Sequence, residues 1–284
     1  MDHVMQAATS IFQHPGMIAL AALAAMAIEY LANLPDANET HDLRETASSL
    51  TIAVINKTVG YLTAGITALP LLMLYEYRVF TIPPDNVLAL LAAFILTDFC
   101  YYWNHFAMHK VRLLWASHSV HHSPTRLNLT AAVRLGLGGQ LAGGFLFYSP
   151  LVLIGFHPLV VYAMLGLGLA YQLFIHPARA PDLGPLEWVL NTPKHHQVHH
   201  ASNPQCIDKN FGGVFIVFDR MFGTFAKAPE HEILKFGLVG KAATSNPLAI
   251  LFGEWGRIAR DVSRARSPKE IWRSLFSMKP RSHG

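Results

Sequence analysis

Charged residues are scarce in this sequence: Asp, Glu, Lys and Arg make up only 14% of its 284 residues, whereas 52% are hydrophobic. A typical soluble domain carries about 25% charged residues. The mean hydropathy is also positive, at +0.29. This composition is unusual for a soluble enzyme and favours a protein embedded in a membrane.

Other features that the sequence lacks narrow the class further. Only Cys100 and Cys206 are present, so no disulfide framework is expected. The first ten residues, MDHVMQAATS, contain no Lys or Arg. They therefore lack the positive start of a signal peptide, and the apolar stretch behind them is expected to be retained. No basic stripe is interleaved with aromatic residues, so no nucleic-acid partner is expected.

Apolar stretches long enough to be candidate membrane spans, which need about twenty residues as helix, recur along the chain. They cover roughly 16–34, 52–75, 86–108, 135–155 and 158–177. The last two are joined by GFHP, so this pair forms either two crossings or a re-entrant arm. The predicted fold class is all-α: an integral membrane helical bundle of four to five spans with a cytoplasmic helical cap.

Lys and Arg are unevenly distributed between the expected loops. Segment 110–134 and the tail after residue 178 are basic, whereas no Lys or Arg precedes the first span. The positive-inside rule therefore places that loop and the tail in the cytoplasm, at a bacterial inner membrane or an ER-type membrane. We expect N-terminal transmembrane helices over 1–85, a catalytic domain over 86–226 and an amphipathic tail over 227–284. The cations of the tail are expected to contact anionic lipid headgroups.

Histidine, by contrast, is abundant, with sixteen in the chain. Ten of them fall in three short boxes and one outlier: His105 and His109 in HFAMH, His118, His121 and His122 in HSVHH, His176 alone, and His195, His196, His199 and His200 in KHHQVHH. Residues four apart on a helix share a face, so the HFAMH pair can reach a common point. Positions i, i+3 and i+4 also fall on one side of a helix, and one HxxHH triplet could therefore bind one ion.

Two HxxHH triplets, the HxxxH pair and His176 together supply nine imidazoles, more than one metal ion can use. They predict a dinuclear site with four or five ligands for each ion. A structural zinc site closes with four ligands and would leave half of the histidines unexplained. Imidazole also suits iron, and a neutral nitrogen set beside lipid favours two iron ions for oxygen activation, although spacing alone does not exclude zinc. His195 is expected to support a ligand or to face the substrate.

Two polar side chains inside the expected spans are candidates to support the metal site. Asp98 lies seven residues before His105, on the same helix face. A carboxylate inside a span is usually functional, and it could accept the free N–H of a ligand imidazole or make a hydrogen bond between helices. Gln172, four residues before His176, could hold a metal-bound water or bond to a neighbouring helix.

The segment that follows the third box is expected to lie near the site. Its DKN sequence, Asp208 to Asn210, predicts a turn whose polar groups meet a lipid headgroup or an electron donor. Asp219 and Arg220 are expected to form an ion pair that fastens the tail. Aromatic residues close to the boxes either line a substrate groove or pack in the core: Tyr101, Tyr102, Trp103, Trp115 and Phe211.

The stretches DFCYYWNHFAMHKVRLLWASHSVHHSPTRLN and NTPKHHQVHHASNPQCIDKNFGGVFIVFDRMFGTF resemble the fatty acid hydroxylase superfamily, also called the sterol desaturase family. The resemblance covers about residues 90–226. Within the superfamily, HHQVHH, IDKNFGGV and DRMFGTF look most like the alkylglycerol monooxygenase-like bacterial branch. This resemblance implies a membrane-embedded, oxygen-dependent di-iron enzyme that hydroxylates or desaturates lipid-like substrates.

The resemblance also implies which residues bind the metal. The family's ligands fall on eight histidines, with His176 as a ninth: His105, His109, His118, His121, His122, His196, His199 and His200. Some members have a further histidine where this sequence has Gln172, so the two ions are expected to differ in coordination number. O2 would be the co-substrate. The sequence has no glycine-rich dinucleotide fingerprint, so electrons would come from a partner reductase, a ferredoxin-type carrier or a reduced pterin.

The expected function is therefore that of a monooxygenase that hydroxylates a C–H bond of a sterol, fatty acyl chain, ether lipid or carotenoid. Desaturation by the same di-iron site is an alternative, since both reactions begin by removing a hydrogen atom. A zinc hydrolase or a metal transporter is the non-redox alternative. A hydrolase would offer a carboxylate base among its ligands, and no Glu lies in any box. A transporter would place histidines or acidic residues near mid-membrane, whereas the histidine boxes are expected at one membrane face.

Overall fold

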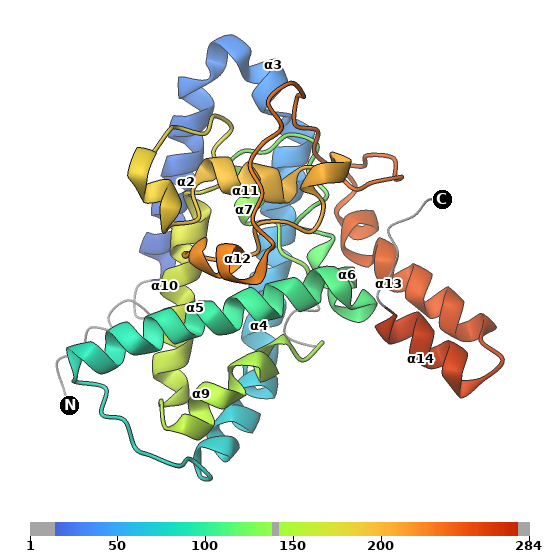
Figure 1. Ribbon diagram of the computed structural model, residues 1–284. Helices are drawn as coiled ribbons and strands as arrows, with labels where there is room; N and C mark the ends of the chain where they lie inside the picture. The colour runs from blue at the N-terminus through green and yellow to red at the C-terminus, as the bar shows by residue number, and fades with distance from the viewer. Residues whose placement is uncertain (1–14, 138–141, 278–284) are drawn as a thin grey trace.

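The computed structural model describes residues 15–137 and 142–277, and this part of the chain is helical with no β-strand (Figure 1). The prediction of an all-α fold is thus confirmed. The α-helices are α2 (Pro15–Ala32), α3 (Ala37–Thr40), α4 (Leu43–Tyr75), α5 (Val87–Lys110), α6 (Arg112–His118), α7 (Leu129–Ala132), α9 (Ser149–Ile154), α10 (Pro158–Leu173), α11 (Pro193–His200), α12 (Val217–Phe222), α13 (Pro247–Arg264) and α14 (Pro268–Phe276). Short 3₁₀ turns are η1 (Leu34–Asp36), η2 (Gly144–Tyr148), η3 (Gly184–Trp188) and η4 (Pro204–Cys206).

Among the described residues, α4 and α5 are long and apolar enough to cross a membrane. A third span is possible if α2 and the segment Leu34–Thr40, bent by 72° at their junction, count as one. Both long helices begin at side-chain caps. Asp42 Oδ1 accepts the Arg44 N–H at 2.8 Å, and Asn86 Oδ1 accepts the Leu88 N–H at 2.9 Å.

The stretches expected to form a fourth and a fifth span are shorter helices. The first is broken into η2 and α9, and α10 contains 16 residues. Glycine accounts for the break, because it is a poor helix former and Gly143 takes a left-handed φ of 83° directly before η2. Residues 138–141 of this expected span lie outside the described residues. α9 and α10 are joined by a tight connection at GFHP, and whether they form a re-entrant arm stays a prediction.

An apolar core joins α4, α5, α9 and α10. Leu71, Ala93, Val152 and Val161 are buried in it, one from each of these helices. α5 also packs along α10 and against α6. This core fixes α5, so its last two turns, which carry His105 and His109, are held against the histidine-bearing segments that follow.

The C-terminal helices α13 and α14 pack on α6, away from the apolar core (Figure 1). Arg112, at the start of α6, is buried and fastens both of them. Its guanidinium forms an ion pair with Asp261 of α13 and donates to the Ser274 carbonyl of α14 at 3.2 Å. The tail is therefore tied to the helix that ends at His118.

Candidate metal centre

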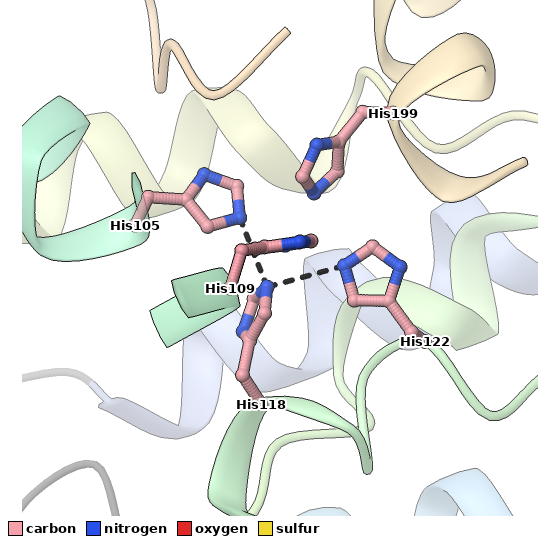
Figure 2. Close-up of side chains that lie close together, drawn as sticks. All are labelled: His105, His109, His118, His122 and His199. Atoms are coloured by element: carbon pink, nitrogen blue, oxygen red, sulfur yellow. Dashed lines mark hydrogen bonds between the residues drawn. The ribbon is translucent and has the colours of Figure 1, made fainter. Parts of the chain in front are cut away.

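Nine buried histidines gather in two groups. The first group contains His105, His109, His118, His122 and His199, and the second contains His121, His176, His196 and His200. Within each group, one ring nitrogen from every histidine lies within 4.8 Å of the corresponding nitrogens of the others. Figure 2 shows the five rings of the first group converging on one region from α5, from the end of α6 and the turn that follows it, and from α11.

Each HxxHH triplet is divided between the two groups. His118 and His122 join the first group while His121 joins the second, and His199 joins the first while His196 and His200 join the second. The idea that one triplet binds one ion therefore does not describe the arrangement. Residues i and i+4 of a helix nearly share a direction, whereas i+3 and i+4 are about 100° apart around the axis. In the structure the i/i+4 pair accordingly faces one group and the i+3 ring faces the other.

In both groups, main-chain carbonyl oxygens accept a hydrogen bond from the Nδ1–H of certain histidine rings. The Nδ1–H of His105 donates to Phe211 O at 2.7 Å, and that of His199 donates to Lys209 O at 2.8 Å. His176 donates in the same way to Gln172 O at 2.6 Å. A carbonyl can only accept, so in each neutral ring the proton sits on Nδ1 and Nε2 presents a lone pair. Such hydrogen bonds orient metal-binding histidines.

The ring nitrogens of the first group fit a bound cation. His118 Nε2 lies 2.9 Å from His105 Nε2 and 3.1 Å from His122 Nε2. It carries at most one proton, so it can donate to only one of these two neighbours. Within the described residues, His199 Nε2 is buried without a hydrogen-bond partner. Burying an unpaired polar atom is costly, and a cation at the centre of the group would satisfy every one of these nitrogens.

The second group has the same property. His196 Nε2 lies 2.9 Å from His176 Nε2 and 3.1 Å from His200 Nε2. Ligands on opposite sides of a metal, each at about 2.1 Å, lie about 4.2 Å apart. Nitrogens within 4.8 Å of one another can therefore close around an ion with small side-chain movements. The donor sets of both groups fit a metal that accepts imidazole.

Burial also keeps these imidazoles in the form that binds a metal. It lowers the pKa of His121 to about 4. It also lowers the pKa of five further histidines of the two groups well below 6.5: His122, His176, His196, His199 and His200. Each ring is therefore neutral at pH 7. A neutral imidazole is the form that coordinates a metal.

A carboxylate does lie beside a ring of the first group, but it comes from Asp208 and not from Asp98. Asp208 Oδ1 is 3.3 Å from His109 Nδ1, and its Oδ2 accepts from Lys110 Nζ at 2.6 Å. The turn that carries it is left-handed at Asp208 (φ 61°) and at Asn210 (φ 56°), a conformation that Asp and Asn tolerate. No spacing links Asp208 to His109 in the sequence, so only the fold reveals the contact.

Asp98 instead holds the loop behind the first group. Its two carboxylate oxygens accept the backbone N–H groups of Val214 and Phe215, both at 2.9 Å. The expected contact with a ring N–H is replaced by this pair. Asp219 works similarly and accepts the N–H groups of Phe211 and Gly212, both at 2.7 Å. The two carboxylates fix the main chain on either side of the carbonyl that holds His105.

The expected ion pair between Asp219 and Arg220 is therefore wrong. The Asp219 carboxylate is taken up by backbone N–H groups and by the Thr224 hydroxyl, which donates at 2.6 Å. Arg220 has other partners. Its guanidinium lies over the rings of Trp188 and Phe225 and donates to Glu187 O at 3.1 Å.

Gln172 and His195 lie near the histidine groups without belonging to either. The Gln172 side chain accepts the Tyr101 hydroxyl at 2.7 Å, while its carbonyl holds His176. His195 is buried at the start of α11, where its Nδ1 accepts the Thr192 N–H at 3.4 Å. Gln172 is thus joined to a neighbouring helix, and His195 is placed as a capping residue. Any role of either residue in catalysis stays a prediction.

The aromatic residues near the histidine boxes do not lie together: some are in the core, one lies beside the first group and one is partly exposed. Tyr102 and Phe211 are fully buried and pack with Phe218. The Trp115 ring lies beside the first group, with its centroid 5.4 Å from that of His109. Trp103 is partly exposed on α5. Tyr102 and Phe211 are accordingly core residues.

Comparison with known proteins places this arrangement in context. The model of the fatty acid hydroxylase family matches residues 90–224. Alkylglycerol monooxygenase of Homo sapiens is 39% identical over 212 residues, which cover 74% of this chain and 46% of that protein. The Danio rerio enzyme of the same name is 40% identical over 203 residues, or 67% of this chain and 45% of that protein. Ornithine lipid hydroxylase OlsE of Rhizobium tropici is 30% identical over 178 residues, or 62% and 53%.

The chain thus spans about half the length of these relatives. No solved structure matches it. All nine histidines of the two groups lie inside the segment that the family model matches.

Proposed function

Because this chain belongs to the fatty acid hydroxylase family, we propose that it is a membrane-bound monooxygenase that hydroxylates a C–H bond of a lipid. One observation carries the proposal: nine buried imidazoles are sorted into a group of five and a group of four. A single structural ion would use four ligands, so this arrangement supports two ions in a reactive centre.

We assign an iron ion to each group, with five imidazoles for one ion and four for the other. Two iron ions would supply O2 activation. With two electrons and two protons from outside, one oxygen atom enters the substrate C–H bond and the other leaves as water. The unequal ligand numbers support a different coordination number at each ion, in line with Gln172 replacing a further histidine.

The chain's own residues orient the donors and exclude water. The carbonyls of Lys209, Phe211 and Gln172 fix three rings with Nε2 toward the centre. Asp98 and Asp219 hold the loop that carries Phe211. All nine rings are buried, which keeps water from intercepting a reactive oxidant.

The substrate class is lipid, because the relatives are named for alkylglycerol and ornithine lipid. A sterol, fatty acyl chain, ether lipid or carotenoid would each meet this description. Electrons would reach the centre from a reductase, a ferredoxin-type carrier or a reduced pterin. The apolar helices α4 and α5 support a multi-pass membrane protein, and the positive-inside rule places the histidines on the cytoplasmic side.

The tail supports contact with anionic lipid headgroups. On α14, the exposed rings of Trp272 and Phe276 lie with centroids 4.3 Å apart. Exposed cations occupy the same two C-terminal helices: Arg257, Arg260, Arg264, Lys269 and Arg273. Aromatic residues beside cations on amphipathic helices are typical of segments that lie on a membrane surface.

The proposal is tested by comparing lipids from cells that express the wild type, His121→Ala, His199→Ala or the exposed-histidine control His231→Ala. We expect a lipid that gains one oxygen atom with the wild type and the control only, together with iron in both purified proteins. A lipid that loses two hydrogens would indicate a desaturase. Zinc in place of iron would support the hydrolase alternative and contradict the proposed redox chemistry.

A further inference from the structure

A hollow of about 530 Å³ lies where α2 ends and α4 begins, in a part of the chain that the histidine groups do not use. Its lining residues are Tyr30, Ala37, Asn38, His41, Asp42, Leu43, Arg44 and Arg126. The volume falls within the range of small-molecule sites in proteins. The lining combines two guanidinium groups with an amide and a phenol.

Several hydrogen-bond donors of this hollow are free to meet a ligand. Over residues 15–137 and 142–277, the side chains of Asn38 and Arg44 and the hydroxyl of Tyr30 have no hydrogen-bond or ion-pair partner. Arg126 uses one nitrogen, Nη1, to contact Asp42 Oδ2 at 3.2 Å. Arginine forks, amides and hydroxyls are donors that suit the oxygens of a phosphate group.

The charge balance of the hollow is positive. Asp42 is its only acidic lining residue, and both of its oxygens are engaged. Oδ1 accepts the N–H groups of Arg44 and Glu45 at the start of α4, and Oδ2 meets Arg126. Two arginines thus face one carboxylate that already caps a helix.

The buried His41 ring, one of the lining groups, is linked to other elements through Glu29. The His41 ring is buried, with Nδ1 at 2.9 Å from the Thr40 hydroxyl and Nε2 at 3.6 Å from Glu29 Oε2. Glu29 in turn accepts the N–H groups of Leu129 at 2.8 Å and Ala178 at 2.7 Å. Since Ala178 lies two residues after His176, the hollow is built on the same framework as the second histidine group.

Exposed apolar side chains belong to the same stretch of chain as the hollow. Leu43, which lines it, is 67% exposed, and Leu31 and Leu34, from the end of α2 and from η1, are 61% and 51% exposed. The shafts of α2 and α4 beyond them also expose apolar side chains. Charged donors next to lipid-facing apolar residues mark the level where headgroups meet acyl chains.

We propose that this hollow binds the phosphate group of a phospholipid, with Arg44, Arg126 and Asn38 around the phosphate and the acyl chains along α2 and α4. The site needs neither metal nor oxygen, so it stands apart from the proposed enzymatic function. The same phosphate chemistry is offered by a soluble phosphate monoester, and the exposed leucines of this stretch of chain favour the lipid.

The experiment is native mass spectrometry of the full-length protein in detergent, titrated with phosphatidylglycerol, with diacylglycerol of the same chains, or with glycerol 3-phosphate. We expect one phosphatidylglycerol to be retained per chain and the other two ligands to bind far more weakly. Arg44→Gln should lower the affinity about tenfold, since it removes a charged hydrogen bond. Lys227→Gln, an exposed residue remote from the hollow in sequence, is the charge-matched control and should leave binding unchanged.

A second variant protects the test against misfolding. Asn38 is exposed and holds no other group, so Asn38→Asp should fold normally and still repel a phosphate. Equal retention of phosphatidylglycerol by the wild type, Arg44→Gln and Asn38→Asp would overturn the proposal. Equal binding of diacylglycerol would also overturn it, and glycerol 3-phosphate binding as tightly as the lipid would replace the lipid by a soluble ligand.

Discussion

His122 and His200 stack on each other although they belong to different groups: their ring centroids are 4.4 Å apart and their planes are inclined by 25°. His200 is also 4.5 Å from His121, centroid to centroid, within its own group. The two groups therefore share a wall of imidazoles. An ion in one group would lie beside an ion in the other, as a dinuclear centre requires.

Substitutions at this wall should affect both ions. We expect His200→Ala to reduce bound metal to less than one ion per chain, because it removes a ligand of the second group and the ring that supports His122. His176→Ala should leave about one ion, since the ring contacts of His176 are confined to the second group. Elemental analysis of both purified variants measures this, and equal metal loss in the two would contradict the shared wall.

Acid should destabilise the metal-free protein. Burial lowers the pKa of His121 from 6.5 to about 4, so between these values the unfolded chain binds a proton that the folded chain does not. The free energy of unfolding therefore falls as the pH drops through this window, by about 3 kcal/mol for His121 alone. The contribution of His121 to the free energy of unfolding is fully present above pH 6.5. Thermal unfolding followed from pH 8 to pH 4 should show this fall, and a flat profile would contradict the prediction.

Asp208 should strengthen metal binding through His109. Asp208→Asn keeps the shape of the side chain but removes the charge that lies 3.3 Å from His109 Nδ1. A change of this kind typically weakens metal affinity by about 10–100-fold. Competition with a chelator measures the affinity. Lys110→Met, which removes the ion pair to the other oxygen of this carboxylate, is the matched control, and the prediction fails if both variants release metal equally fast.

The sequence predicts the histidines of this centre better than their arrangement. HxxxH and HxxHH spacings reveal which rings share a helix face, and the nine rings do gather in the fold. The spacing explains why the i+3 ring of each triplet faces a different group from the i/i+4 pair. Which rings of the two triplets meet in one group depends on how α11 lies against the end of α6, which no local pattern encodes. Asp208 meets His109 for the same reason, through a long-range contact. The position of Asp98 in an apolar helix marks it as unusual, but its partners, Val214 and Phe215, come from a distant loop.

The sequence pattern also does not predict how long each apolar helix is. Hydropathy alone makes 135–155 a candidate span, whereas glycine breaks it into η2 and α9. Composition identifies apolar segments, but backbone freedom decides whether such a segment forms one helix.

Gly213 should be essential for the contact between Asp98 and the loop behind the first group. A Cβ at Gly213 would come within 2.5 Å of Asp98 Oδ1 and 3.0 Å of Gln172 Nε2. We expect Gly213→Ala to displace the carboxylate from the Val214 N–H and to lower stability by about 1–3 kcal/mol, the cost of a buried hydrogen bond left unmade. Because this loop also carries the Phe211 carbonyl that orients His105, bound metal should fall as well.

The control for this substitution is Gly166→Ala on α10, where an added Cβ meets no atom within 4 Å. In a helix this change should be neutral or stabilising by up to about 1 kcal/mol. Thermal unfolding and metal content of the two variants separate a specific clash from a general effect of adding a methyl group. If Gly213→Ala retained both its stability and its metal, the contact of Asp98 with the loop would not be needed to orient the histidines.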